Sequence, residues 1–171
     1  MNKKITSLIL ALAMMACSVS SFAKDDEEKP QVKVAEAAYG TPVIDGEQDS
    51  VWNSTNYNVF DNVVGTDSTF YKGWFKVLWD EENMYMLAKV YSEQFSNMDD
   101  SPWENDSIEY FIDEDCMRTT TYFDDDYQLR IGFDSALSAN NYDVNNMTGK
   151  AVRGDNYYIA ELSFPYKTVT P

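Results

Sequence analysis

Residues 101–113 read Ser101-Pro102-Trp103-Glu104-Asn105-Asp106-Ser107-Ile108-Glu109-Tyr110-Phe111-Ile112-Asp113. The polar first half contains a proline and predicts a turn that presents Trp103, and a strand follows at once. In that strand the side chains alternate, so that one row faces a core and the other points away from it. The inward row is Ile108, Tyr110 and Ile112, and the outward row is Glu109, Phe111 and Asp113.

A second stretch, Tyr127–Phe133, repeats this alternation. Its inward row is Tyr127, Leu129, Ile131 and Phe133, and its outward row is Gln128 and Arg130. If the two strands pair, Glu109 and Arg130 share a face beside the indole of Trp103. This combination suits a sugar, because sugar hydroxyls need planar donors and acceptors and sugar C–H faces stack on rings. We therefore predict Trp103, Glu109 and Arg130 as carbohydrate-binding residues.

Each of these residues also has a purely structural interpretation. Of the four tryptophans, Trp52, Trp74 and Trp79 fit apolar core rows, whereas the polar turn around Trp103 favours an exposed ring. Glu109 and Arg130 also fit an ordinary cross-strand ion pair, which contributes ~0.2–1 kcal/mol. The two interpretations of this pair are compatible, because a carboxylate held by arginine is already oriented for a hydroxyl.

Two hairpins are predicted on either side of this region. Apolar residues at 73–79 and 84–91 flank Asp80–Asn83 and predict central strands covered on both sides. Near the end, residues 150–153 and 157–164 flank the turn-forming sequence Gly154-Asp155-Asn156.

Shorter elements are expected elsewhere. Residues 42–44 predict a strand that leads into a tight turn at Asp45-Gly46, and residues 117–123 predict a further short strand. Asp49 or Ser50 is expected to cap one helical turn that brings Val51 and Trp52 inward. No stretch sustains the helical period beyond about a turn, so the predicted fold is an all-β, antiparallel β-sandwich.

The beginning of the chain resembles an export signal. A charged start, an apolar run from Ile5 to Cys17 and small residues up to Ala23 predict a signal peptide at 1–23. We expect cleavage after Ala23 and a secreted or periplasmic protein; the alternative is a lipoprotein anchored through Cys17. Residues 24–38 are charged and lack a strand pattern, which predicts a flexible spacer before a single domain at 39–171.

Composition excludes several classes of function. Residues 1–23 hold two of the 13 basic residues and none of the 29 acidic ones, so their removal takes the net charge from −16 to −18. Such a charge repels nucleic acid. The chain contains no histidine, which excludes Ser-His-Asp catalysis and His-ligated metals. Without Cys17, Cys116 has no partner for an internal disulfide.

Six segments, in this order, resemble a family 9 carbohydrate-binding module, the type attached to bacterial xylanases. They are Tyr39–Gly46, Val51–Asn53, Val77–Asp80, Pro102–Glu109, Asp124–Arg130 and Tyr158–Glu161. The resemblance implies a jelly-roll-like sandwich that binds xylan, cellulose or their oligosaccharides and tethers a glycoside hydrolase catalytic domain. It implies that Trp103 is one of two clamping tryptophans, with Glu109 and Arg130 as polar partners. The family continues past Pro171 with the second tryptophan and further strands, so the resemblance covers roughly the first two thirds of the module.

Acidic residues gather after the strand at 108–113 and before the strand at 127–133. Asp113–Asp115 and Asp124–Asp126 offer oxygen ligands, which calcium prefers. The leading interpretation is nevertheless a solvated acidic loop, since the spacing of an EF-hand is absent. The resemblance implies structural calcium in the family but assigns no ligands here.

Two other functions compete with sugar binding. Glu104, Asp106 and Glu109 could act as paired carboxylates in a glycoside hydrolase, although an arginine beside Glu109 would keep it ionised. A calcium-stabilised surface or adhesion protein is the third hypothesis. The leading prediction remains a non-catalytic module.

Overall fold

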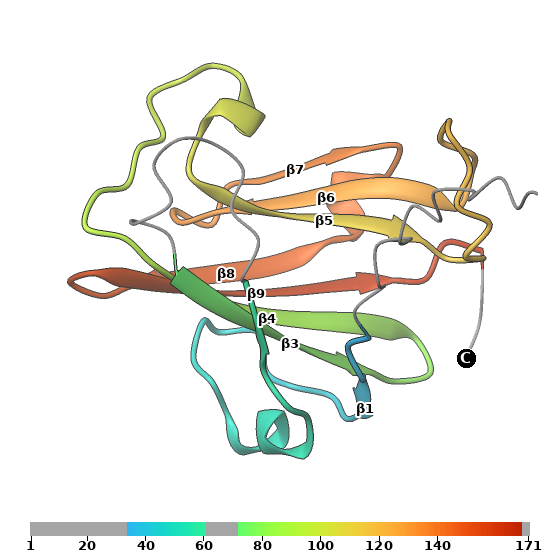
Figure 1. Ribbon diagram of the computed structural model, residues 1–171, viewed down its shortest axis with the longest axis horizontal. Helices are drawn as coiled ribbons and strands as arrows, with labels where there is room; N and C mark the ends of the chain where they lie inside the picture. Colours follow the sequence, from blue (N-terminus) through green and yellow to red (C-terminus); the bar gives the residue numbers. More distant parts are fainter. Residues whose placement is uncertain (1–33, 61–71, 169–171) are drawn as a thin grey trace, which may run out of the picture. The chain divides into compact units, whose positions relative to one another are not determined.

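The computed structural model describes residues 34–60 and 72–168, and these residues form an all-β domain. The structure confirms the predicted antiparallel β-sandwich, with two sheets that lie one above the other (Figure 1). No α-helix occurs among the described residues, and none of their helices is long and apolar enough to cross a membrane. The elements are β1 (Ala38–Tyr39), η1 (Ser50–Ser54), β2 (Asn58–Val59), β3 (Lys72–Trp79), β4 (Asn83–Tyr91), η2 (Pro102–Glu104), β5 (Ser107–Asp113), β6 (Asp126–Gly132), β7 (Leu137–Asn140), η3 (Val144–Asn146), β8 (Thr148–Arg153) and β9 (Tyr157–Pro165), where η marks a 3₁₀ helix.

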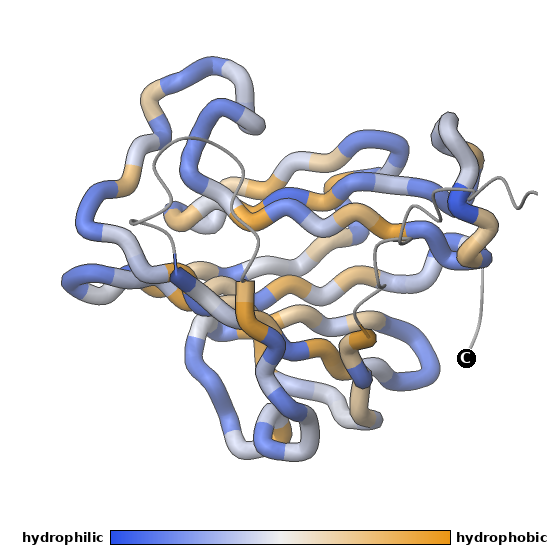
Figure 2. Tube along the Cα trace, in the orientation of Figure 1, coloured by the Kyte–Doolittle hydropathy of each residue, from blue (hydrophilic) through white to orange (hydrophobic). Residues whose placement is uncertain are grey.

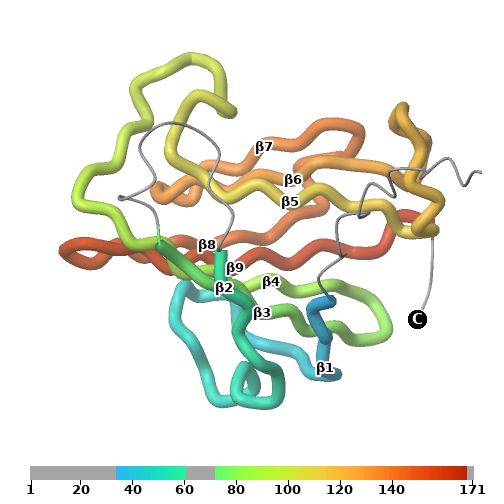
Figure 3. Tube along the Cα trace, viewed as in Figure 1, coloured from blue at the N-terminus to red at the C-terminus, as the bar shows by residue number. Residues whose placement is uncertain are grey.

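The larger sheet has the strand order β1-β3-β4-β9-β8, and β2 pairs with β3 (Figure 3). All of its pairs are antiparallel except that of β1 with β3. Both predicted hairpins, β3–β4 and β8–β9, are confirmed. The turn between β3 and β4 is held by Asp80, whose Oδ1 accepts the backbone amides of Glu82 and Asn83 at 2.9 and 2.8 Å.

The smaller sheet has the order β5-β6-β7, and all its pairs are antiparallel. The predicted pairing of the strands at 108–113 and 127–133 is confirmed, and Glu109 lies directly opposite Arg130. The third strand, β7, has no sequence prediction. Its position makes β6 the central strand of this sheet.

The main core lies between the two sheets, where alternate residues of each strand meet. From β5 and β6 come the predicted inward residues, among which Leu129 and Ile131 are fully buried. From the larger sheet come Ala160, Leu162 and Phe164 of β9, which are also fully buried. Apolar residues are concentrated along the strands and hydrophilic residues at the connecting loops (Figure 2).

A second apolar cluster covers the other face of the larger sheet. It consists of Trp52, Leu78, Tyr85 and Leu87, with Trp74 packed against it. The N-terminal segment supplies Trp52 from η1, which Asp49 caps by accepting the amide of Val51 at 3.0 Å. This segment lies beneath the larger sheet in Figure 1, so the central strands are covered on both sides, as predicted.

The predicted strand at 42–44 is wrong. These residues have no strand pairing, and the chain turns next at Gly46, whose φ is +86°. The amide of Val43 donates to Oδ2 of Asp49 at 3.0 Å instead of to a neighbouring strand. The amides of Asp45 and Gly46 that follow donate to the carboxylate of Glu161 at 3.0 and 2.8 Å. Side-chain acceptors thus take the place of a ladder here.

The predicted strand at 117–123 is also wrong, because carboxylates capture its amides. The amides of Met117 and Arg118 donate to Asp115 and Asp113 at 2.9 and 2.8 Å. Arg118 has a φ of 53°, in the left-handed region, which a strand cannot accommodate. The segment is therefore a loop between β5 and β6.

The expected signal peptide at 1–23 and most of the spacer at 24–38 lie outside the described residues. Residues 34–37 have no regular secondary structure. Ala38 differs from the prediction, because it already belongs to β1 and pairs with Leu78.

Candidate functional site

The outer face of the smaller sheet carries two rows of side chains that point away from the core. The strand register places three residues side by side in each row, one from each strand. The first row is Glu109, Arg130 and Ser138, and the second row is Phe111, Gln128 and Asn140.

The polar members of these rows form one continuous hydrogen-bonded network. Arg130 forms an ion pair with Glu109 through its Nε, and its Nη1 donates to Ser138 Oγ at 2.9 Å. Gln128 Nε2 donates to the other oxygen of Glu109 at 2.7 Å, and Asn140 Nδ2 donates to Gln128 Oε1 at 2.9 Å. Each group fixes its neighbour, so the face presents planar donors and acceptors in set orientations.

The predicted outward direction of Gln128 and Arg130 is confirmed, yet neither side chain is open to solvent. Arg130 is only 3% exposed, because Glu109 and Ser138 flank it from the two neighbouring strands. The Glu109 side chain is 27% exposed and remains accessible. The pair is therefore a preorganised, partly desolvated ion pair rather than a loose surface one.

A short loop presents the predicted aromatic ring at the start of β5. Trp103 lies in η2 and is 60% exposed, as its polar sequence context predicted. The side chain of Asn105 holds this loop by accepting the amide of Asp99 at 2.9 Å and donating to its carbonyl at 2.8 Å. Asp106 adds a bond from the Ser96 amide at 2.6 Å, so the ring projects from a tied turn.

A hollow of about 230 Å³ connects this loop with the first row. Pro102, next to the exposed ring, and Arg130 both line it, together with Ser138. The remaining polar lining includes Asp106 and Asp134, whose carboxylates are held by backbone amides at 2.6 and 3.0 Å. The structure thus brings Glu109 and Arg130 into contact and places Trp103 on the loop that borders the same hollow.

Sequence reasoning missed Ser138 and Asn140, because it did not predict β7. The alternation in the strand at 127–133 predicted that the Gln128 side chain points outward, but no function was predicted for this residue. The only sequence signal for β7 is a short alternation in Leu137–Asn140, which is weak without knowledge of its neighbour.

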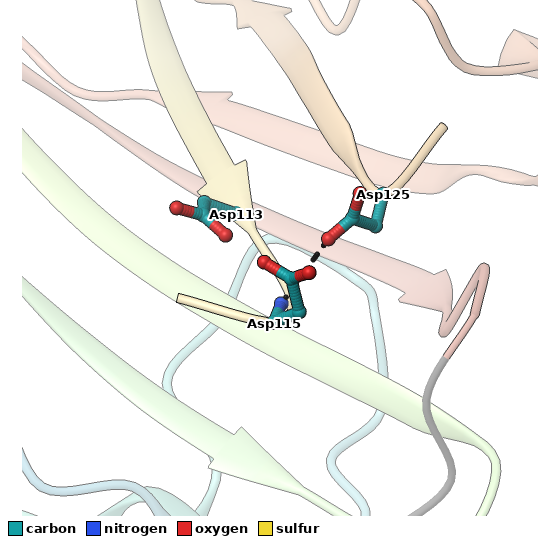
Figure 4. A group of neighbouring side chains, drawn as sticks. All are labelled: Asp113, Asp115 and Asp125. Atoms are coloured by element: carbon teal, nitrogen blue, oxygen red, sulfur yellow. Dashed lines mark hydrogen bonds between the residues drawn. The ribbon is translucent and has the colours of Figure 1, made fainter. Parts of the chain in front are cut away.

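Three acidic side chains meet at the opposite end of β5. Ligand oxygens of Asp113, Asp115 and Asp125 lie within 4.8 Å of one another (Figure 4). Oδ1 of Asp113 is buried and has no hydrogen-bond partner among residues 34–60 and 72–168. A bond from the Met117 amide acts to lower the pKa of Asp115, but loss of hydration and the neighbouring Asp125 carboxylate raise it overall. Oxygen ligands that repel one another fit a hard cation such as calcium.

Glu114 and Asp126, which were also predicted for this cluster, accept hydrogen bonds from other groups. Glu114 accepts bonds from the Tyr127 hydroxyl at 2.7 Å and from the amides of Lys167 and Thr168, both at 2.8 Å. Burial acts to raise the pKa of Glu114, but these bonds lower it. Asp126 accepts the Phe123 amide at 2.8 Å.

Comparisons with known proteins agree with this geometry. The family described as "Carbohydrate family 9 binding domain-like" matches residues 44–171. Endo-1,4-beta-xylanase A of Thermotoga neapolitana is 40% identical over 147 residues, which are 82% of this chain and 14% of the enzyme. Exoglucanase XynX of Acetivibrio thermocellus is 32% identical over 140 residues, 81% of this chain and 13% of that protein. The chain thus spans about one seventh of these relatives.

Solved structures show the same likeness. A family 9 carbohydrate-binding module from Caldicellulosiruptor kristjanssonii, in complex with cellotriose, is 29% identical with a TM-score of 0.73. The match covers 79% of this chain and 68% of that one, and the same module has been solved with glucose.

The matched part of each enzyme is a binding module, so this chain is not an enzyme by itself. The hydrolase hypothesis fails for this reason. In addition, both oxygens of Glu109 are engaged by Arg130 and Gln128. The chain belongs to the family 9 carbohydrate-binding modules.

Proposed function

We propose that this module binds chains of cellulose or xylan, or their oligosaccharides, at the outer face of the smaller sheet. Trp103 stacks on one face of a sugar ring, while Glu109 and Arg130 bond to its hydroxyls. The observation that carries the proposal is that Arg130, which is ion-paired with Glu109, lines a hollow bordered by the loop of an exposed indole. Complexes of a related module with cellotriose and glucose support a sugar as the ligand.

Calorimetric titration with glucose, cellobiose and xylobiose tests this proposal. Trp103→Ala should weaken binding by about 1–2 kcal/mol, the value of one aromatic contact, which corresponds to roughly five- to thirty-fold in Kd. Met98→Ala is a matched control, because Met98 lies in the same loop, is 91% exposed and touches no proposed sugar contact. Equal Kd values for both variants and the wild type would remove Trp103 from the site.

We further propose an exported role, in which the module holds a glycoside hydrolase catalytic domain on plant polysaccharide. The xylanase relatives support the enzymatic partner, and the charged and apolar pattern of residues 1–23 supports export. Calcium at Asp113, Asp115 and Asp125 would stabilise the loop between β5 and β6, because three carboxylates there otherwise repel one another.

A further inference from the structure

Phe111 is a large apolar side chain on an otherwise polar face. It is 65% exposed, on the outer side of β5, two residues beyond Glu109. Single exposed apolar residues are common and need no explanation by themselves. The neighbours of Phe111 set it apart, because they belong to the hydrogen-bonded network of the sugar-binding face.

Those neighbours are two amides in the same row. Gln128 lies directly opposite Phe111, and Asn140 lies opposite Gln128 on the next strand. Asn140 is exposed and directs one N–H to Gln128, so the rest of its amide faces solvent with donor and acceptor capacity. An exposed ring beside planar amides has the composition of a sugar subsite.

The two rows are also connected and suitably spaced. Gln128 donates to Glu109 at 2.7 Å, so a group bound at one row and a group bound at the other touch a single network. Two residues along a strand span about 6.8 Å. This distance is comparable to the length of one ring in a β-1,4-linked chain.

We propose that Phe111, Gln128 and Asn140 form a second sugar position, which holds the ring adjacent to the one at Glu109 and Arg130. The ligand then runs along β5, from the Trp103 loop towards the end of the strand, and the site takes β-1,4-linked oligosaccharides in preference to single sugars. This inference rests on the proposed function. It goes further by assigning residues that set the preferred chain length.

The test is a comparison of Kd for glucose, cellobiose and cellotriose by calorimetry. We expect the wild type to bind cellotriose more tightly than glucose. In Phe111→Ala and Phe111→Leu, Kd for cellotriose should rise about five-fold, because one aromatic contact with the sugar is lost. Kd for glucose should stay unchanged. Phe111→Tyr keeps the ring and should keep the tighter binding of cellotriose.

Tyr57→Ala is the matched control, since Tyr57 is 64% exposed but lies before β2, away from this face. It should bind all three sugars like the wild type. Phe111→Leu guards against a folding defect in Phe111→Ala, and melting curves of both variants verify the fold.

The outcomes separate the two proposals. A wild type that binds glucose and cellotriose equally, or Phe111 variants that retain the full gain with chain length, would overturn the second position and leave the first intact. A wild type that binds none of the three sugars would overturn both.

Discussion

Replacement of Glu161 by glutamine should destabilise the domain, because it replaces one buried acceptor oxygen with a donor group. Glu161 lies on β9 and is fully buried, with no exposed surface. One of its oxygens accepts the amides of Asp45 and Gly46 at 3.0 and 2.8 Å, and the other accepts the indole N–H of Trp52 at 2.8 Å. Three donors from the N-terminal segment therefore converge on one carboxylate.

The glutamine side chain has only one oxygen to offer these three donors. If that oxygen takes the two backbone amides, the NH₂ group faces the indole N–H of Trp52, and two donors meet without an acceptor. An unsatisfied buried donor costs about 1–3 kcal/mol. Glu161→Ala leaves all three donors unpaired and should cost about 3 kcal/mol or more by the same reasoning. A domain stable by about 5–15 kcal/mol would lose a large part of its stability.

Urea unfolding monitored by tryptophan fluorescence measures these losses. Trp52→Phe removes the donor that glutamine cannot satisfy, so it should cost about 1 kcal/mol less in the Glu161→Gln background than in the wild type. Glu47→Gln, at an exposed position in the same N-terminal segment, is the control and should unfold like the wild type. Additivity of the two substitutions within about 0.5 kcal/mol, or an unchanged midpoint for Glu161→Gln, would refute the reasoning.

Three further predictions concern charge. Burial acts to raise the pKa of Asp80, but bonds from Tyr85, Thr41 and two amides lower it to about 2. Stability should therefore fall as the pH drops from 3.8 towards 2, and acid melts of Asp80→Asn should show a weaker dependence on pH than those of the wild type. Glu109→Gln should weaken sugar binding about ten-fold or more in calorimetry, through loss of a charge-assisted bond, and wild type and variant should both show no hydrolysis of xylan. Calcium should raise the Tm of the wild type, and EDTA should reverse the increase. The control variant Asp124→Asn should respond in the same way, whereas the Tm of Asp125→Asn should not change with calcium. Equal responses of the two variants would place the ion elsewhere.

The parts of the fold that could be predicted are those in which a long strand pairs with its neighbour in sequence. In β3–β4 and β8–β9 the apolar pattern and the intervening turn residues both indicate a hairpin. The pairing of β5 with β6 was also predictable, because a shift by one residue would turn Leu129 outward and Arg130 into the core.

The errors arose where local side chains compete for backbone amides. At 117–123 the sequence has strand-like residues, but Asp113 and Asp115 capture two of the amides. At 42–44 the competitor is Asp49, which accepts the amide of Val43 at 3.0 Å. Glu161, more than a hundred residues away in sequence, accepts the amides of Asp45 and Gly46 that follow, and no local pattern could reveal this contact. The same limit hid the second row of the candidate site, since Asn140 joins it only through the unpredicted strand β7.

Arg130 is part of the proposed binding face and also stabilises the smaller sheet. Although it points away from the core, Arg130 is 3% exposed and bonded on both sides, to Glu109 and to Ser138. Its removal would leave a partly buried carboxylate unpaired, which destabilises the folded state irrespective of any ligand. The exposed rings of Trp103 and Phe111 make no such contribution, because neither belongs to an apolar cluster. The polar centre of the candidate site is thus required for the stability of the sheet, whereas the two exposed aromatic residues are not required in this way.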